Sequence, residues 1–281
     1  MLEYPNCKIN LGLHVVRRRN DGYHDLESLF IPVPLCDELE INPSTRFSFM
    51  QSGINVGCYP EDNIVVKAFN LMQKECGTRL PDVEIHLHKK IPFGAGLGGG
   101  SSDAAFTLRM LNNLFDLGMD NQRLRILAAK LGADCAFFID NRPALVKGIG
   151  DQLTTLDFNP LKGHTLLMVK PDESVSTAEA YRGITPRAQR SIQTTCDLSK
   201  AVTRPIGEWK ELIVNDFEET VFTHHPRLAA IKEELYAEGA LYASMSGSGS
   251  TIYGIFNPES ADAKQLDKKF SKYNNTFIYN I

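Results

Sequence analysis

Apolar residues recur at every second position in several short segments of the chain, and this alternation predicts β-strands. The first segment covers residues 6–16, where Ile9, Leu11 and Leu13 share one period. Asn20-Asp21-Gly22 follows and is typical of a turn, so residues 23–31 are expected to form a returning strand. Further strands are predicted within 37–58, with a turn at 42–44, over 83–88, 166–169 and 251–256, and around 242.

Other segments repeat their apolar residues at the helical spacing of three and four positions. Residues 62–76 do so behind Asp62, a suitable N-cap, and Gly77 is placed to end that helix. Ala104, Leu108 and Leu111 give the next helix one apolar face. Further helices are predicted over residues 121–131, 176–182, 208–222 and 226–238.

The two kinds of pattern are mixed along the chain, which indicates an α/β protein of the α+β type. Between residues 141 and 163 Asn, Pro, Gly and Asp become frequent, and a new strand starts at 166. A chain of 281 residues is long for one compact core and fits two domains of medium size. We therefore predict a boundary near residues 153–164, with one domain over 1–155 and a second over 156–281.

Composition and charge narrow the class of protein. Hydrophobic residues make up 43% of the chain and charged residues 23%, as in an ordinary globular protein. The formal net charge of -4 gives no basic surface for nucleic acid or for an anionic membrane. The first residues do not have the charged and then apolar pattern that is typical of a targeting segment, and no apolar run approaches membrane-spanning length. We expect a cytoplasmic protein with a small-molecule ligand, no nucleic acid partner and no membrane partner; a monomer and a homodimer are both open.

The cysteines and histidines give no metal-binding pattern. The six cysteines are dispersed, without a CxxC pair, and are predicted to be buried thiols in a reducing compartment. They are Cys7, Cys36, Cys58, Cys76, Cys135 and Cys196. His86 and His88 share one face of a predicted strand, but no third ligand is near them in the sequence, so we predict that they face solvent and hold no metal.

The most informative segment is Pro92-Phe93-Gly94-Ala95-Gly96-Leu97-Gly98-Gly99-Gly100-Ser101-Ser102, between a predicted strand and an amphipathic helix. We call residues 94–100 the first glycine loop. Glycine lets backbone N–H groups converge on an anion, and the N-terminus of the following helix adds unpaired N–H groups, so we predict phosphate binding here. A flexible linker is the alternative, but linkers do not usually join a strand to an amphipathic helix.

The first glycine loop does not match two common nucleotide-binding motifs. It lacks the Gly-Lys-Ser/Thr ending of a P-loop. Gly94-x-Gly96-x-x-Gly99 fits a dinucleotide fingerprint formally, but no early βαβ unit with a suitably placed acidic residue accompanies it.

A second glycine cluster, residues 246–249, lies between two short apolar runs, and we call it the second glycine loop. Taken alone it is typical of a hairpin turn. Two glycine loops in one chain favour another interpretation, in which one loop closes over what the other holds.

Three segments, in their order and spacing, resemble the signature motifs of the GHMP kinase superfamily. They are Lys8-Ile9-Asn10-Leu11, the run PFGAGLGGGSSDAA from Pro92, and SMSGSGSTIYGIF from Ser244. More narrowly, RNDGYHDL over residues 19–26 and LGAD over 131–134 resemble members whose acceptor alcohol carries a cytidine diphosphate group, in the non-mevalonate route to isoprenoid precursors. The match runs from residue 6 to about 256. It implies a two-domain fold, with a ribosomal-protein-S5-like N-terminal domain, a ferredoxin-like α+β C-terminal domain and the active site between them.

The resemblance also implies a reaction, the transfer of a phosphoryl group from ATP to a substrate hydroxyl. Asp134 would take the proton of that hydroxyl. Lys8 beside it would keep the carboxylate ionised and stabilise the charge of the transferred group.

For the nucleotide, the resemblance implies that residues from Pro92 to Ser102 bind the ATP phosphates and that Asn63 lies near the adenine. A helix N-cap explains Asp62 and Asn63 equally well. Ser101 or Ser102 would lie near Mg²⁺. We expect ATP and water to supply most of the Mg²⁺ ligands, and we assign no residue as a metal ligand. Asp103 places a negative charge in the first turn of the predicted helix, where it is favourable for the helix dipole but would repel nearby phosphates, an effect that Mg²⁺ would moderate.

For the acceptor, the resemblance implies that Tyr23 stacks on the cytosine and that His24 bonds to its polar edge. Tyr181 would close the other face of the base, and Asn10 would orient the reacting end. The second glycine loop would add further substrate contacts. Its residues are Ser246, Gly247, Ser248 and Gly249.

Two alternatives stay open on the sequence. A sibling GHMP kinase acting on homoserine, mevalonate or a sugar has no base for Tyr23 and His24 to bind. A nucleotide-binding protein of the same fold without catalysis has no need of Lys8 and Asp134. Considered alone, each of these two has an ordinary structural explanation, an exposed lysine beside a strand and a helix cap.

Overall fold

The computed structural model describes residues 1–189 and 197–281. Its internal contacts divide these residues into two compact units. Unit 1 holds Met1–Lys8, Pro34–Phe93 and Gly98–Arg142, and unit 2 holds Ile9–Val33, Gly94–Leu97 and Pro143–Ile281. Each unit therefore combines segments that are distant in sequence, and the chain crosses between units inside the first glycine loop. The domain limits at residues 155 and 156 stay a prediction.

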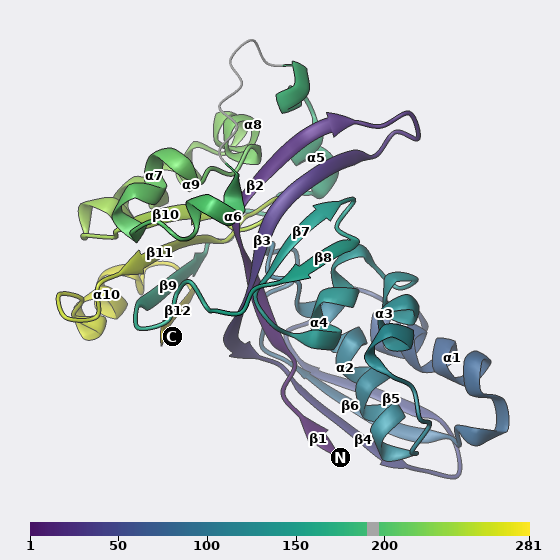
Figure 1. Cartoon of the computed structure of the whole chain (residues 1–281). Helices are drawn as coiled ribbons and strands as arrows, with labels where there is room; N and C mark the ends of the chain where they lie inside the picture. Colours follow the sequence, from purple (N-terminus) through teal and green to yellow (C-terminus); the bar gives the residue numbers. More distant parts are fainter. Residues whose placement is uncertain (190–196) are drawn as a thin grey trace. The chain divides into compact units, whose positions relative to one another are not determined.

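Unit 1 is a four-stranded sheet with helices over one face (Figure 1). The strand order is β1-β4-β6-β5, with β5 parallel to β6 and the other neighbours antiparallel. The strands are β1 Leu2–Glu3, β4 Glu38–Pro43, β5 Ser48–Gly53 and β6 Val83–Lys89. The helices are α1 Ile64–Cys76, α2 Gly99–Leu114, α3 Asn121–Ala129 and α4 Phe137–Asp140, with short 3₁₀ turns η1 Pro60–Asp62, η2 Gly77–Arg79 and η3 Ala133–Ala136. Alternate residues of β6 are buried, so the sheet has one apolar face.

Unit 2 contains two sheets, but the start of β2 (residues 6–8) and the end of β3 (residues 34–36) belong to unit 1. In the first, the hairpin of β2 and β3 is extended by β7 and β8 in the order β2-β3-β7-β8. The second has the order β10-β11-β9-β12, with all neighbours antiparallel. The strands are β2 Asn6–Arg18, β3 His24–Cys36, β7 Ala144–Gly148, β8 Gln152–Thr155, β9 Thr165–Lys170, β10 Tyr242–Met245, β11 Ile252–Phe256 and β12 Asn275–Asn280. Counted along the chain, the second sheet has the order 2-3-1-4, which is the ferredoxin-like arrangement predicted for this part of the protein.

The helices of unit 2 pack on the second sheet through one continuous core. Val221 of α8, Ile231 of α9 and Phe270 of α10 meet Leu167 and Val169 of β9 there, and all five are buried. The helices are α5 Thr177–Tyr181, α6 Leu198–Ala201, α7 Trp209–Leu212, α8 Phe217–His224, α9 Pro226–Ala237 and α10 Ala263–Phe270, with 3₁₀ turns η4 Arg187–Gln189 and η5 Ile206–Glu208. Among the described residues, no helix is long and apolar enough to span a membrane.

Most predicted elements are present, with three differences. Helix α1 starts at Ile64, and its N-cap is Asn63, whose side chain accepts a bond from Val65 N, whereas Asp62 lies in a 3₁₀ turn. The single helix expected over 208–222 is two helices, α7 and α8, because residues between them pair with β2. The pattern also missed β1, α4, β7, β8, α6, α10 and β12.

The prediction of buried thiols is correct for three cysteines, Cys7, Cys76 and Cys135. It is wrong for Cys58, which is exposed, and for Cys36, which is partly exposed. Cys196 lies outside the described residues.

Candidate active site

Lys8 and Asp134, the two predicted catalytic residues, meet in unit 1. Lys8 lies in β2 with 3% of its surface exposed, and its Nζ is 3.4 Å from Asp134 Oδ2. Asp134 stands in the first turn of η3, and 31% of its side chain is exposed. A buried lysine is costly unless a carboxylate lies beside it. The pair thus joins a fixed positive charge to a carboxylate that solvent or a substrate reaches.

The glycines at the start of α2 fit closely around this pair. Gly98 is the N-cap and has a left-handed backbone, with φ +69°. A Cβ there would lie 3.1 Å from Lys8 Cε and 3.2 Å from a ring carbon of Phe138. A Cβ on Gly99 would lie 2.8 Å from Ile91 Cγ2. Glycine is therefore needed at both positions, and the helix start can lie directly against the lysine chain.

The first turn of α2 has the properties of an anion site. Its opening N–H groups have no acceptor within the helix, and the helix dipole adds positive charge there. Ser101 is half-buried, whereas Ser102 is fully buried, and its Oγ has no hydrogen-bond partner among the described residues.

Asp103 does not face this anion site, contrary to the expectation from the sequence. Its side chain is buried, and Oδ2 accepts a hydrogen bond of 2.7 Å from Lys89 Nζ. Lys89 also pairs with the buried Asp37, whose Oδ1 accepts from Lys90 N at 2.6 Å and Ile91 N at 2.8 Å. Burial raises the pKa of Asp103 well above its ordinary value, and Asp37 adds to this, although Lys89 opposes it. The charge of Asp103 is thus neutralised inside unit 1.

The rest of the first glycine loop lies in unit 2, against the second glycine loop. Gly96 has φ +73°, and a Cβ there would lie 2.0 Å from the carbonyl oxygen of Ser246. Ser246 Oγ donates to Gly96 O at 2.9 Å, and Thr251 N donates to Ala95 O at 3.3 Å. The two loops are therefore in direct contact. Ser248 Oγ, at the tip of the second loop, is 3.4 Å from Thr177 Oγ1.

Asn10 joins the same group in unit 2. It is 2% exposed, its backbone N donates to Ser246 Oγ at 3.1 Å, and its Nδ2 donates to Ser28 Oγ at 2.9 Å. Ser28 Oγ in turn donates to Gly12 O at 2.5 Å. A Cβ on Gly247 would be 3.1 Å from Asn10 Oδ1, so glycine is needed there for close approach. Nothing in the sequence had singled out Ser28, which fixes the Asn10 carboxamide.

His24 and Tyr181 are brought together, and Tyr23 is not. The rings of His24 and Tyr181 stack with their centroids 4.7 Å apart and their planes at 20°. Tyr181 also meets Phe217 edge to face at 4.8 Å. Burial, with a smaller effect of Arg18, lowers the pKa of His24, so its imidazole is neutral near pH 7 and offers one donor and one acceptor. Tyr23 is 64% exposed.

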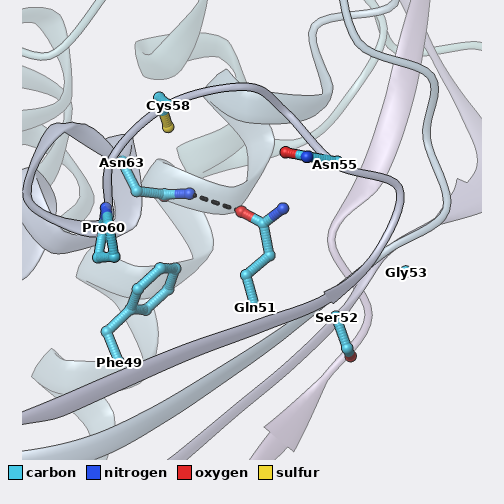
Figure 2. Close-up of a pocket in the computed structure, with 8 residues that line it drawn as sticks. All are labelled: Phe49, Gln51, Ser52, Gly53, Asn55, Cys58, Pro60 and Asn63. Carbon is cyan, nitrogen blue, oxygen red and sulfur yellow. Dashed lines mark hydrogen bonds between the residues drawn. The ribbon is translucent and has the colours of Figure 1, made fainter.

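Asn63 lines a pocket of about 340 Å³ within unit 1. Its Oδ1 caps α1, and its Nδ2 donates to Gln51 Oε1 at 3.0 Å, as Figure 2 shows. The wall also includes Phe49, Cys58 and Pro60. Of the other predicted nucleotide residues, Phe93 is 70% exposed and Pro92 is half-buried.

His86 and His88 of β6 were predicted to face solvent, and this prediction is wrong. Both are half-buried, with His86 Nε2 at 2.9 Å and His88 Nδ1 at 2.8 Å from Ser52 Oγ. Within residues 1–189 and 197–281, no three side chains of His, Cys, Asp or Glu are grouped so as to hold a metal ion.

Family models match both parts of the chain. The model described as GHMP kinases N terminal domain matches residues 63–142, and the one described as GHMP kinases C terminal matches residues 198–273. Together these ranges cover more than half of the chain, so the protein belongs to the GHMP kinase family.

Individual relatives show which members of the family this chain is similar to. The protein is 51% identical over 263 residues to the 4-diphosphocytidyl-2-C-methyl-D-erythritol kinase of Bacteroides thetaiotaomicron, covering 92% of this chain and 93% of the relative. It is 44% identical over 270 residues to the enzyme of the same name from Porphyromonas gingivalis, covering 95% of each. A crystal structure of 4-(cytidine 5'-diphospho)-2C-methyl-D-erythritol kinase matches 99% of this chain and 98% of its own, with 32% identity and a TM-score of 0.82. A mevalonate kinase structure covers 99% of this chain and 98% of its own with a TM-score of 0.75, but at 15% identity it shares only the fold.

Proposed function

We propose that the protein transfers the γ-phosphoryl group of ATP to the 2-hydroxyl of 4-diphosphocytidyl-2-C-methyl-D-erythritol. The products are the 2-phosphate and ADP, and the step belongs to the methylerythritol phosphate route to isoprenoid precursors. The observation that carries the proposal is the 51% identity, over 92% of the chain, to a kinase of that name. The small-molecule partner is then an alcohol with a cytidine diphosphate group, and ATP is the co-substrate.

In this mechanism Asp134 accepts the proton of the attacking hydroxyl. Its carboxylate is 31% exposed, so a hydroxyl can reach it, while the buried Lys8 stays 3.4 Å away. A general base contributes about 10²–10⁴-fold in rate. The lysine charge is fixed before the reaction and stabilises the negative charge of the transferred group at no cost in reorganisation.

The N–H groups at the start of α2 and in the first glycine loop bind the phosphates of ATP in this proposal. Mg²⁺, when bound, neutralises part of the phosphate charge. The buried Ser102 Oγ, which has no hydrogen-bond partner among the described residues, fits such an ion because a hydroxyl is a hard oxygen donor. The location of Asp103 away from the anion site removes the repulsion expected from the sequence.

Acceptor recognition is assigned to His24, Tyr181 and Asn10, with the second glycine loop beside Asn10. Stacking on the ring of Tyr181 gives affinity for a flat base, and the neutral imidazole of His24 offers hydrogen bonds to its edge. Tyr23 is 64% exposed, so most of its ring surface is open to a ligand. For the nucleotide, the pocket beside Asn63 has the size and the amide-rich wall that suit a purine.

The proposal is tested by following ADP release with the cytidyl substrate, homoserine and mevalonate as acceptors. Only the first should be phosphorylated; turnover of homoserine or mevalonate alone would assign the chain to a sibling activity. Asp134→Asn should lower kcat by about 10²–10⁴-fold and leave ATP affinity nearly unchanged. The matched control is Asp267→Asn, on the exposed face of α10, which should behave as the parent. Near-normal kcat in Asp134→Asn would remove Asp134 as the base.

A further inference from the structure

The segment between α7 and α8 lies against β2 and contributes two buried polar side chains, Asn215 and Asp216, to unit 2. Leu13 N donates to Val214 O at 3.0 Å, and Asp216 N donates to Leu13 O at 2.8 Å, so the backbone of this segment pairs with β2. Asn215 and Asp216 are 3% and 4% exposed. The segment is therefore held rigidly, and the direction of the Asn215 side chain is set by the backbone.

The carboxamide of Asn215 is fully used by the second glycine loop and by α8. Its Nδ2 donates to Met245 O and to Gly247 O, both at 2.8 Å, and its Oδ1 accepts from Phe217 N at 3.0 Å. The two carbonyl groups that it binds stand on either side of Ser246. Only a primary amide offers two donors and an acceptor in this space, and an unpaired buried carbonyl is costly.

Ser246 connects the segment that Asn215 holds to two predicted site residues, Asn10 and Gly96. Its Oγ accepts from Asn10 N at 3.1 Å and donates to Gly96 O at 2.9 Å. Glu218 supports the strand before the loop, since its Oε1 accepts from Met245 N and from Ser244 Oγ, each at 2.8 Å. A shift of the loop would therefore break contacts with both β2 and the first glycine loop.

We propose that Asn215 is a positioning residue for phosphoryl transfer, which sets the backbone of residues 245–247 and through Ser246 the placement of Asn10 and the first glycine loop. The inference rests on the proposed kinase function. Its reason is geometric, because displacement of a site by about 1 Å costs up to roughly 100-fold in rate.

The test is Asn215→Asp, which has nearly the same shape but sets a carboxylate oxygen against two carbonyl oxygens. We expect kcat to fall by roughly 10- to 100-fold at neutral pH. Burial raises the pKa of the introduced carboxyl, and its protonated form regains one donor, so kcat relative to the parent should recover as the pH is lowered. Asn215→Leu, which has no proton to gain, should show a loss that does not change with pH. The difference between these two pH profiles reports on protonation of the introduced carboxyl group at this position.

The matched control is Asn112→Asp, because Asn112 also holds a turn through its carboxamide, with Nδ2 to Met119 O at 3.1 Å and Met119 N to Oδ1 at 2.9 Å. That substitution should lower stability but leave kcat and KM as in the parent. Amide hydrogen exchange without ligand gives a readout independent of activity: exchange at residues 244–249 should speed up in Asn215→Asp and not in Asn112→Asp.

Unchanged exchange at 244–249, or a kcat within about twofold of the parent, would overturn the inference. If the parent phosphorylates no acceptor, the proposed function fails, and the exchange experiment still decides whether Asn215 places the loop. If Asn215→Asp does not fold, Asn215→Ser, which is too short to reach either carbonyl, is measured for the same two effects.

Discussion

Removing the ammonium group of Lys89 should weaken unit 1 severely, because this group is shared by two buried carboxyl groups. The side chains of Lys89, Asp37 and Asp103 are 4%, 0% and 2% exposed. Burial alone would lower the pKa of Lys89, but the two carboxylates outweigh it and raise that pKa, so the lysine is charged throughout the useful pH range. Lys89→Met leaves both carboxyl groups without their cation.

The loss of unfolding free energy in Lys89→Met depends on which of the two carboxyl groups stays ionised. Breaking a buried ion pair by removing one partner costs about 3–5 kcal/mol. Asp103, whose pKa is raised, can take up a proton, and Asp37 keeps its bonds from Lys90 N and Ile91 N, so we expect the lower end, about 3 kcal/mol. At about 2–4 °C per kcal/mol this corresponds to a fall in Tm of roughly 6–12 °C.

The assay is urea unfolding followed by circular dichroism, with Lys90→Met as the control. Lys90 is the next residue, but its pair with Glu38 is exposed, so its loss should leave the unfolding free energy within error. The pH dependence adds a second test. Because the folded pKa of Asp103 is raised, its contribution to stability is complete below the pKa of the unfolded carboxyl and is lost as the pH rises toward the folded value. The unfolding free energy of the parent minus that of Asp103→Asn should therefore decrease as the pH rises above the ordinary pKa of an aspartate. A Lys89→Met protein as stable as Lys90→Met would refute this reasoning.

Three further predictions concern the loops and the ligands. In thermal unfolding, Gly96→Ala should prevent normal folding or lower Tm by more than about 10 °C, since its Cβ would lie 2.0 Å from a carbonyl oxygen. In the control Gly163→Ala, where φ is +79° and the space is open, the unfolding free energy should fall by only about 1–2 kcal/mol. Tyr181→Ala should raise KM for the cytidyl substrate by roughly 5- to 150-fold, as expected for about 1–3 kcal/mol of base stacking, and steady-state assays with Tyr23→Ala would tell whether the exposed ring shares this role. Lys8→Met should lower kcat by about 10²-fold or more. Lys8→Arg should not restore kcat, because a planar guanidinium does not fit the space that the ammonium group occupies beside Gly98. Equal kcat values for the parent, Lys8→Met and Lys8→Arg would exclude an electrostatic role of Lys8.

Periodicity predicted the elements in which local pattern and tertiary environment agree. The alternation in β6 is an example, and the same alternation also indicates that Lys89 is buried. Val83, Ile85 and Leu87 point inward, so Lys89 at the next inward position had to be buried and to need a carboxylate. The sequence could not tell that Asp103 would supply it, since that contact depends on how α2 packs on the sheet.

The missed features depend on contacts between distant segments. The helix expected over 208–222 is interrupted because Val214 and Asp216 bond to Leu13 of β2, and a helical backbone cannot make those bonds as well. Likewise Asn215 stands in an ordinary polar stretch before a helix, and only the carbonyl groups of the second glycine loop give it a role. The motifs predicted the residues closest to the expected chemistry; the side chains that hold those residues leave little trace in local spacing.

The interleaving of the two units also sets an order in which the protein can be built during synthesis. β2 and β3 leave the ribosome early, but β7, which pairs with β3, starts only at Ala144, after nearly all of unit 1. Because domains tend to fold as the chain emerges, the sheet of unit 1 can be complete while one edge of β3 still lacks its partner. An open strand edge is a site for wrong pairing. The β2–β3 hairpin, which carries Asn10 and His24, therefore has an unpaired strand edge in the nascent chain until β7 has been synthesised.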